Sequence, residues 1–277
     1  MQRSKARRGA VRSGARLRAE EARLAETTER PKAESKPLRL NQAIAQSGLC
    51  SRRRANELVL AGRVKVNGQR AVSFSALVEP GRDLIEVDGQ PVAKRDFVYV
   101  MLHKPKGIIT TCSDQLARST VLDLLPPSLQ DLKPAGRLDR DSQGLLLLTN
   151  DGVLIQALTH PKSHFPKTYR VSVAGLLSPS AIKKLESGVR LSGSLTQNAK
   201  IRLISAKTGK SSFEIVIYEG KNRQIRRMCG SLGLPVINLL RVAIGGLQLS
   251  GLKSGTWRHL SGQELSRLRQ DLMGGSS

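Results

Sequence analysis

Residues 136–152 read GRLDRDSQGLLLLTNDG, so that four consecutive leucines stand between a charged loop and a cluster of turn-forming residues. A short apolar run bounded by turn residues is typical of a strand that is buried on both faces. The charged loop follows Pro134 and has a glycine at each end, where the backbone can come close to a ligand. The stretch therefore predicts a buried strand over 144–149, with an acidic, arginine-rich loop before it and a turn after it.

Strand and helix patterns alternate on both sides of this buried strand. Residues 97–103 favour a strand, and apolar residues alternate along 169–173 and 213–217. Helices are expected from Ser178-Pro179 to Gly188, over about 223–232 and after a Ser261 cap, with more strand around 236–249. Interleaved strands and helices joined by hairpin-like turns predict an α+β domain with a mixed or antiparallel sheet over residues 97–272.

Residues 37–92 have the pattern of a smaller, independent domain. An apolar helical face at 40–44 ends at Gly48, and Ser51 is placed to cap a second helix. The pair Asn67-Gly68 that follows is the strongest short signal for a hairpin turn. The segment predicts two short helices on a small β-sheet, and a chain of 277 residues has room for both domains.

The charge balance points to a polyanionic partner. The chain holds 46 Lys plus Arg against 22 Asp plus Glu, a formal net charge of +24. Nucleic acid is the leading explanation for such an excess, and a generally basic, soluble surface is the alternative. No run of 18 apolar residues and no apolar signal core occur, so a cytoplasmic protein is expected. The scattered cysteines and histidines predict no metal site.

Residues 1–36 differ in composition from the rest of the chain. The first 18 residues hold seven basic side chains and no acidic one, and large apolar residues are almost absent throughout. This composition predicts a disordered basic arm, transiently helical across 15–27. A solvated tail without a role and an organelle transit peptide, which would place the protein in an organelle stroma, are the alternatives.

Basic residues also gather in the small domain, in the first turn of its second helix. Cations at a helix start oppose the helix dipole, so local helix stability does not explain them. A phosphate backbone does, and a solvated charged face is the alternative. The candidate RNA-binding residues of this domain are Arg39, Arg52, Arg53, Arg54, Arg63 and Lys65.

Two segments of the large domain carry candidate chemistry. Asp139 lies among arginines at the edge of the buried strand, and nearby positive charge favours the ionised form of a carboxyl. It is either a reactive carboxylate or an ion-paired loop residue. In EGKNRQIRRM, 219–228, Ile225 and Met228 can anchor the inner face of a helix. That would leave four basic residues for a cleft, for RNA phosphates or for solvent: Lys221, Arg223, Arg226 and Arg227.

The stretch LNQAIAQSGLCSRRRANELVLAGRVKVNG, 40–68, closely resembles the S4-type RNA-binding domain. This resemblance implies that the helical pair docks on structured RNA. S4-type domains also occur in proteins without catalytic activity, so the resemblance of this segment does not imply an enzyme.

The large domain resembles the pseudouridine synthases of the RsuA/RluB type. The matching stretches are GRLDRDSQGLLLLTNDG at 136–152, KTYRV at 167–171 and EGKNRQIRRM at 219–228, with HKPKG at 103–107 and GLKSGTWRHL at 251–260. Together with the S4-type stretch, the resemblance spans nearly everything from 37 to 270 in the family's order. It implies isomerisation of a uridine in ribosomal RNA, without cofactor or metal.

Carried over position by position, the resemblance implies four roles. Asp139 matches the catalytic aspartate, and Tyr169 the aromatic residue that packs on the target base. Arg226 matches the arginine that pairs with the catalytic carboxylate, and Arg137 the one near the space left by the flipped nucleotide. Asp141 and Asp151 are the nearest competitors of Asp139, and Asp151 has the simpler interpretation of a turn residue beside Gly152. All roles fall on one chain, which predicts a monomer.

The sequence leaves alternatives for the RNA substrate and for the functional class of the protein. The S4-type stretch and the catalytic motif favour large-subunit, 23S-type RNA over small-subunit 16S RNA. A non-catalytic RNA-binding or ribosome-assembly factor would explain the charge and the small domain, but not the three residues in a catalytic context. An RNA methyltransferase would need a glycine-rich cofactor loop after a strand, and the sequence has none.

Overall fold

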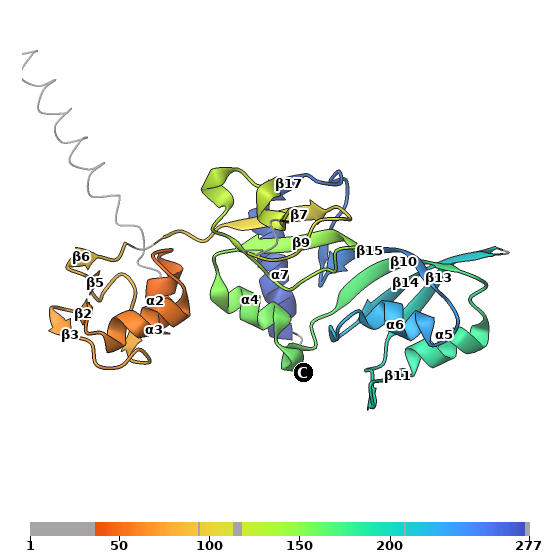
Figure 1. Ribbon diagram of the computed structural model, residues 1–277, viewed down its shortest axis with the longest axis horizontal. Helices are drawn as coiled ribbons and strands as arrows, with labels where there is room; N and C mark the ends of the chain where they lie inside the picture. The colour runs from red at the N-terminus through yellow and green to blue at the C-terminus, as the bar shows by residue number, and fades with distance from the viewer. Residues whose placement is uncertain (1–36, 94, 113–117, 208, 275–277) are drawn as a thin grey trace, which may run out of the picture.

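The computed structural model describes residues 37–93, 95–112, 118–207 and 209–274. A small N-terminal domain is joined to a larger domain built on a nine-stranded sheet (Figure 1). The fold is α+β, as the sequence predicts. The expected basic arm, 1–36, and its helical stretch, 15–27, lie outside the described residues.

The small domain packs two helices on two short sheets. Its helices are α2 (Leu40–Gln46) and α3 (Arg52–Leu60), and Ser51 caps α3 by accepting a hydrogen bond from the backbone N–H of Arg54. The turn at Asn67-Gly68 has positive φ at both residues, as the expected hairpin requires. The strands are β1 (Leu38–Arg39) with β4 (Leu77–Val78), and β3 (Gln69–Arg70), β2 (Val64–Val66), β5 (Ile85–Val87) and β6 (Gln90–Pro91) in that spatial order.

The main sheet has the order β13-β14-β10-β15-β9-β7-β17, with β8 on β9 and β16 on β15. Pro134, expected in an irregular loop, belongs to β8, and the strand expected at 236–249 is two strands. Every pair is antiparallel except β15 with β9. The strands are β7 (Tyr99–Lys104), β8 (Lys133–Pro134), β9 (Gln143–Thr149), β10 (Lys167–Ala174), β13 (Lys200–Lys207), β14 (Lys210–Ile217), β15 (Val236–Ile244), β16 (Leu247–Gln248) and β17 (Trp257–His259).

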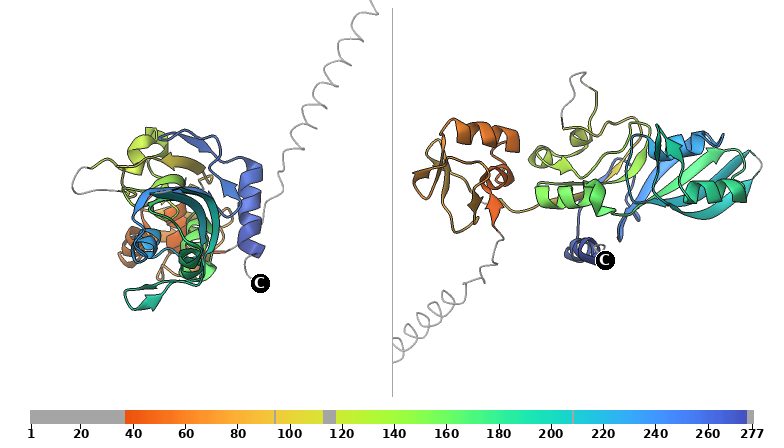
Figure 2. Two further views of the ribbon diagram at one scale, coloured as in Figure 1. Left: turned by 90° about the vertical axis from the view of Figure 1, so that its right-hand side faces the viewer. Right: turned by 90° about the horizontal axis from the view of Figure 1, so that it is seen from below.

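The four leucines of β9 are fully buried because both faces of this half of the sheet are covered. Leu145 and Leu147 pack with helices α4 (Gly152–Thr159) and α7 (Gly262–Gly274), of which α7 lies on the outside of the sheet (Figure 2). Leu146 and Leu148 point the other way, toward the 3-10 helices η1 (Val121–Leu124) and η2 (Pro127–Leu129). The predicted two-sided burial of this strand is confirmed.

The other half of the sheet carries its own layer. Helices α5 (Pro179–Glu186) and α6 (Gln224–Gly230) cover strands β10, β14 and β15, and a small hairpin, β11 (Arg190–Leu191) and β12 (Ser194–Leu195), lies beside them. Helix α5 begins after Ser178, as expected, with Ser178 as its cap, and Gly233 follows α6 with a positive φ. Helix α6 is shorter at each end than the predicted 223–232.

The two halves of the sheet meet in only two parallel residue pairs of β9 and β15. At this junction a Cβ on Gly144 would stand 2.3 Å from the carbonyl oxygen of Arg241, and φ of Gly144 is +116°. Glycine is therefore required here by the neighbouring strand. The expectation that Gly144 makes room for a ligand is wrong, because the backbone of β15 fills that space.

Asp151, a competitor of Asp139 in the sequence, has a structural role. It is buried, and its Oδ1 caps α4 by accepting from the backbone N–H groups of Val153 and Leu154. Its Oδ2 accepts from the hydroxyl of Tyr99 at 2.9 Å, and Arg269 of α7 donates to the same hydroxyl at 3.0 Å. The carboxylate thus ties α4 to β7 and α7.

Glu264 anchors the first turn of α7, and Glu264→Gln is expected to lower the free energy of unfolding by about 1–2 kcal/mol at pH 7. Arg258 donates to the Glu264 carboxylate at 2.7 and 2.6 Å, and the N–H of Ser261 at 2.9 Å. The hydrogen bonds from Arg258, foremost, lower the pKa of Glu264 from 4.5 to about 2. Because the folded pKa lies below the unfolded one, this stabilisation is present above pH 4.5 and lost as pH falls toward 2.

Denaturant unfolding of both proteins across that pH range checks the expectation. The stability difference between wild type and variant should shrink below pH 4.5. Glu57→Gln is the matched control, because the ion pair of Glu57 with Arg54 leaves both side chains more than half exposed. It should change stability by less than about 0.5 kcal/mol at any pH. A pH-independent deficit for Glu264→Gln would contradict the linkage.

Candidate active site

A cleft of about 710 Å³ opens in the large domain where the two halves of the sheet meet. Its walls come from the segment after β7, from the loop before β9, from strands β10, β14 and β15, and from the start of α6. Among the candidate residues of the sequence, five line it: Arg137, Asp139, Tyr169, Lys221 and Arg223. Side chains far apart along the chain are thus brought to one place.

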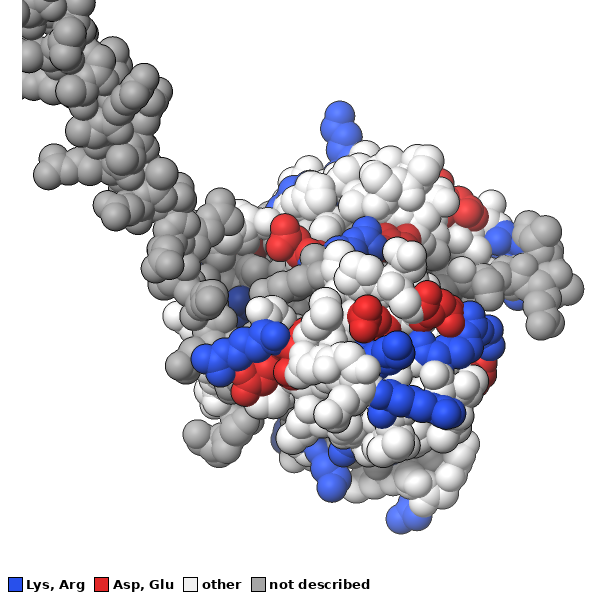
Figure 3. Space-filling view, turned by 90° about the vertical axis from the view of Figure 1, so that its left-hand side faces the viewer, with Lys and Arg blue, Asp and Glu red and all other residues white. Residues whose placement is uncertain are grey.

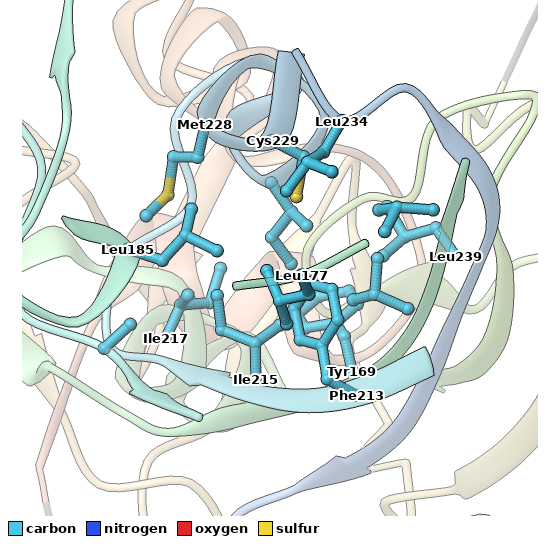
Figure 4. Packing of buried hydrophobic residues seen from close by; sticks show 14 of the residues in the cluster. Tyr169, Leu177, Leu185, Phe213, Ile215, Ile217, Met228, Cys229, Leu234 and Leu239 are labelled. Atoms are coloured by element: carbon cyan, nitrogen blue, oxygen red, sulfur yellow. The ribbon is translucent and has the colours of Figure 1, made fainter. Parts of the chain in front are cut away.

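The floor of the cleft is apolar. Tyr169 is 8% exposed and belongs to the buried cluster between α6 and the sheet, near Ile215 and Leu239 (Figure 4). Leu138, Ile217, Ile225 and Leu239 line the cleft beside it. Ile225 and Met228 are buried under α6, which confirms the predicted anchoring of that helix. An aromatic ring among aliphatic side chains suits the face of a planar base.

Asp139 presents its carboxylate to the cleft, with 32% of the side chain exposed. The cation beside it is Arg223, whose Nη1 lies 3.9 Å from Oδ2 of Asp139. The resemblance implies Arg226 as the partner, and in this structure that expectation is wrong. Arg226 donates to the carbonyl oxygens of Asp141 and Val236, and these two bonds turn its Nε toward the carboxylate of Asp141.

Asp141 holds both arginines. Arg223 donates to its two oxygens at 3.0 Å each, and Nε of Arg226 lies 3.2 Å from Oδ2, close enough for an ion pair but poorly aligned for a hydrogen bond. The hydrogen bonds from Arg223 are the main cause of a lowered pKa for Asp141. Asp141 faces a smaller hollow next to the cleft, lined also by Gly107, Arg140 and Arg223.

The backbone of the Asp139 loop is fixed by a buried lysine. Lys104, at the end of β7, is fully buried, and its Nζ donates to the carbonyl oxygens of Asp139 at 3.1 Å, Ser142 at 2.9 Å and Pro105 at 3.0 Å. Burial lowers the pKa of Lys104 to about 8, against the opposing effect of Asp139 and Asp141. The hydroxyl of Thr110 also holds this loop, because it donates to the carbonyl oxygen of Leu138 and accepts from the backbone N–H of the same residue.

The sequence did not single out Lys104, although it lies within the quoted HKPKG stretch. The available signal was a lysine directly after an apolar strand and before a turn, where a side chain has to run back over the strand end. Spacing alone does not tell such a lysine from an exposed one.

Two of the basic candidates near α6 are engaged with the β11–β12 hairpin. Lys221 donates to the carbonyl oxygen of Leu195 at 2.9 Å, and Arg227 to the hydroxyl of Ser192 at 2.6 Å. Arg226 and Arg227 do not line the cleft. The cations of the segment 219–228 thus have different tasks: Arg223 lines the cleft, Lys221 lines it and also binds the hairpin, Arg227 binds the hairpin, and Arg226 binds the loop of Asp141.

The basic candidates of the small domain lie outside the cleft. Arg54 pairs with Glu57, and Arg63 donates to both oxygens of Asp88 at 2.7 and 2.6 Å. Arg39, Arg52, Arg53 and Lys65 are exposed. Seen from the end where this domain lies, Lys and Arg side chains alternate with Asp and Glu (Figure 3).

Within the described ranges, no group of three or more His, Cys, Asp and Glu side chains is arranged to hold a metal ion. No helix among the residues described is long and apolar enough to cross a membrane.

Comparison with known proteins matches both domains. The family model for RNA pseudouridylate synthase matches residues 98–231, and that for the S4 domain matches residues 38–85. "Ribosomal large subunit pseudouridine synthase B" of Bacillus subtilis (strain 168) is 42% identical over 233 residues, 83% of this chain and 95% of its own. "Dual-specificity RNA pseudouridine synthase RluF" of Escherichia coli (strain K12) is 38% identical over 82% of this chain and 77% of its own.

A solved structure agrees with these sequence matches. The crystal structure of a pseudouridylate synthase superposes with a TM-score of 0.61 at 31% identity and covers 83% of this chain and 99% of that one. The fold, the two matched domains and the identity over most of the chain lead to one assignment. The chain belongs to the RNA pseudouridine synthase family, in the form that carries an S4 domain ahead of the catalytic domain.

Proposed function

We propose that this protein isomerises one uridine of large-subunit, 23S-type ribosomal RNA to pseudouridine, with Asp139 as the reacting carboxylate. The observation that carries this is the placement of Asp139 and Tyr169 in one cleft with an apolar floor. The volume of about 710 Å³ falls in the range of about 300–1,000 Å³ usual for small-molecule sites. The relative from Bacillus subtilis, named for the large ribosomal subunit, supports the choice of RNA.

The reaction needs an extruded nucleotide. The bond from ribose carbon 1 to uracil nitrogen 1 breaks, the uracil turns, and its carbon 5 bonds to the same sugar carbon. Carbon 5 loses a proton and nitrogen 1 gains one, so no electron or group has to come from a second reactant. The target uridine leaves its stack and enters the cleft, where Tyr169 meets the face of the base.

Each wall of the cleft has a task in this scheme. Asp139, on the cleft wall formed by the loop before β9, acts on the ribose or the uracil, either as a nucleophile or as a general base. The apolar floor around Tyr169 and Leu239 retains the detached uracil and keeps water away from the open sugar. Arg137, exposed at the cleft, is placed to meet the RNA near the extruded nucleotide.

The S4 domain supplies affinity and orientation. It recognises a folded local RNA shape, free or within a pre-ribosomal particle, while the cleft of a single chain performs the chemistry. The basic arm at 1–36 adds salt-sensitive, sequence-independent attraction to RNA.

Pseudouridine mapping tests this function. Purified protein is incubated with unmodified 16S-type and 23S-type transcripts without any added cofactor, and new pseudouridines are located. One site in the large-subunit transcript is expected. A site only in the small-subunit transcript would overturn the choice of RNA and keep the chemistry. No product on either transcript or on isolated assembly particles would favour a non-catalytic RNA-binding factor.

Arg52→Gln together with Arg53→Gln is expected to weaken binding of the target RNA about 10-fold and to lower the salt slope by about 1.5. Both arginines are exposed in the first turn of α3, and unlike Arg54 and Arg63 neither is in a recorded ion pair among the described residues. Filter binding across a salt series measures both quantities. Arg82→Gln, which removes a cation paired with Glu79, is the control. Equal losses for both proteins would show a general effect of charge.

A further inference from the structure

Arg223 stands between two carboxylates at the mouth of the cleft. Its guanidinium makes two parallel hydrogen bonds of 3.0 Å to Asp141, and its Nη1 lies 3.9 Å from Asp139. It lines both the cleft and the neighbouring hollow. A group bound at this position would therefore lie next to the nucleotide that reacts.

The side chain is held from an unusual backbone position. Arg223 precedes the first residue of α6 with φ +46° and ψ +35°, a left-handed conformation that few residues other than glycine adopt. The first turn of α6, which includes Arg226, follows directly after Arg223. The arginine is presented at the mouth of the cleft and not along the side of the helix, and 45% of its side chain is exposed.

The Asp141 carboxylate does less to hold the Arg226 side chain in place than to hold that of Arg223. Arg226 keeps two backbone acceptors, the carbonyl oxygens of Asp141 and Val236, whatever side chain occupies position 141. Arg223, by contrast, has its two short hydrogen bonds on the Asp141 carboxylate. With 46% of Asp141 also exposed, the pair is open to solvent and to an incoming anion.

We propose that Asp141 occupies, in the RNA-free protein, the place of an RNA phosphate on Arg223, and that RNA docking exchanges the carboxylate for the phosphate. A planar guanidinium binds carboxylate and phosphate in the same two-pronged geometry, so the exchange needs no new shape. Asp141 then stays on Arg226. The inference rests on the proposed RNA substrate. It makes Asp141 a positioning residue, which holds Arg223 until an RNA phosphate takes its place.

The exchange predicts that removing the carboxylate strengthens RNA binding. Asp141→Asn keeps the size of the side chain and removes the competing charge, so the Kd for RNA should fall about two- to fivefold, the range expected for an exposed ion pair. Arg223→Gln should raise the Kd and reduce the salt slope by about 0.7–0.9, the share of one phosphate. Combined with Arg223→Gln, the Asp141→Asn gain should vanish.

The controls separate this exchange from a general effect of charge. Asp96→Asn removes one exposed acidic group between the domains and should leave the Kd within about 1.5-fold of wild type. Asp141→Ala should repeat the gain of Asp141→Asn, and thermal unfolding verifies that each variant is folded. Binding is measured with two RNA probes: the unmodified large-subunit fragment around the target uridine, and a plain uridine oligonucleotide. The second probe remains informative if no pseudouridine is formed.

Two outcomes would overturn the inference. If Asp141→Asn binds neither probe more tightly than wild type and Asp96→Asn, the carboxylate does not compete with RNA. If the gain persists in the Arg223→Gln background, Asp141 acts through the overall charge and not through Arg223. Either result leaves the proposed isomerisation standing, because that depends on product formation and not on these affinities.

Discussion

Asp139→Asn is expected to abolish pseudouridine formation, with a single-turnover rate at least about 10³-fold below wild type. The amide has nearly the shape of the carboxylate but is neither a nucleophile nor a base. The change should leave the fold intact, because among the described residues the 3.9 Å contact with Arg223 is the only ion pair of the side chain, while the backbone carbonyl keeps the hydrogen bond from Lys104. Quantitative mapping on the large-subunit transcript measures the rate.

Asp141→Asn is the informative comparison for this prediction. Both aspartates lie in the same loop and both meet Arg223, but only Asp139 lines the cleft. The Asp141 variant is expected to form product at a measurable rate. If Asp141→Asn were as inactive as Asp139→Asn, or if Asp139→Asn turned over, Asp139 would not be the reacting carboxylate.

The second large effect is expected at Lys104, where substitution by methionine should lower the free energy of unfolding by about 3 kcal/mol and the rate by about 100-fold. Methionine fills the space of the apolar stem but leaves three carbonyl oxygens, one buried and two partly buried, without the ammonium. One of them belongs to Asp139, so the loop that carries the carboxylate loses its fixed position. Denaturant unfolding and single-turnover mapping measure the two losses.

Lys167→Met is the matched control for Lys104→Met. Lys167 is partly buried, and burial likewise lowers its pKa to about 8, but its Nζ donates to one carbonyl oxygen, that of Phe165. It should lose only about 1 kcal/mol of stability. An unchanged free energy of unfolding in Lys104→Met would mean that the desolvation of the ammonium offsets its three hydrogen bonds.

The sequence predicted local structure where the signal is local. The burial of β9, the cap at Ser51, the start of α5 after Ser178 and the hairpin at Asn67-Gly68 each depend on a few neighbouring residues, and the structure has them as expected. Strand β13 was not predicted, because it lies at the edge of the sheet with most of its side chains exposed, and the alternation that starts at Ile201 and Leu203 is not continued along the strand.

The candidate site was predicted in composition but not in pairing. The sequence brought Asp139, Tyr169 and the basic residues before α6 into one hypothesis, and the structure places them around one cleft, while their chemical roles stay predictions. The expected partner of Arg226 was wrong because two backbone acceptors, the carbonyl oxygens of Val236 and of the distant Asp141, fix the direction of its side chain. Such acceptors belong to every residue and leave no trace in the sequence.

The backbone contact at Gly144 has a consequence for how this protein tolerates change. Asp139 precedes β9 and Tyr169 lies on β10, which is paired to β15, so the carboxylate and the ring belong to two separate halves of the sheet. Their mutual alignment depends on the junction where the backbone of Arg241 lies against this glycine, and on the contacts of Arg223 and Arg226 with the loop before β9. Position 144 therefore works as a spacer. A larger residue at position 144 would push β9 and β15 apart. Even if the protein still folded, Asp139 would then be displaced relative to Tyr169.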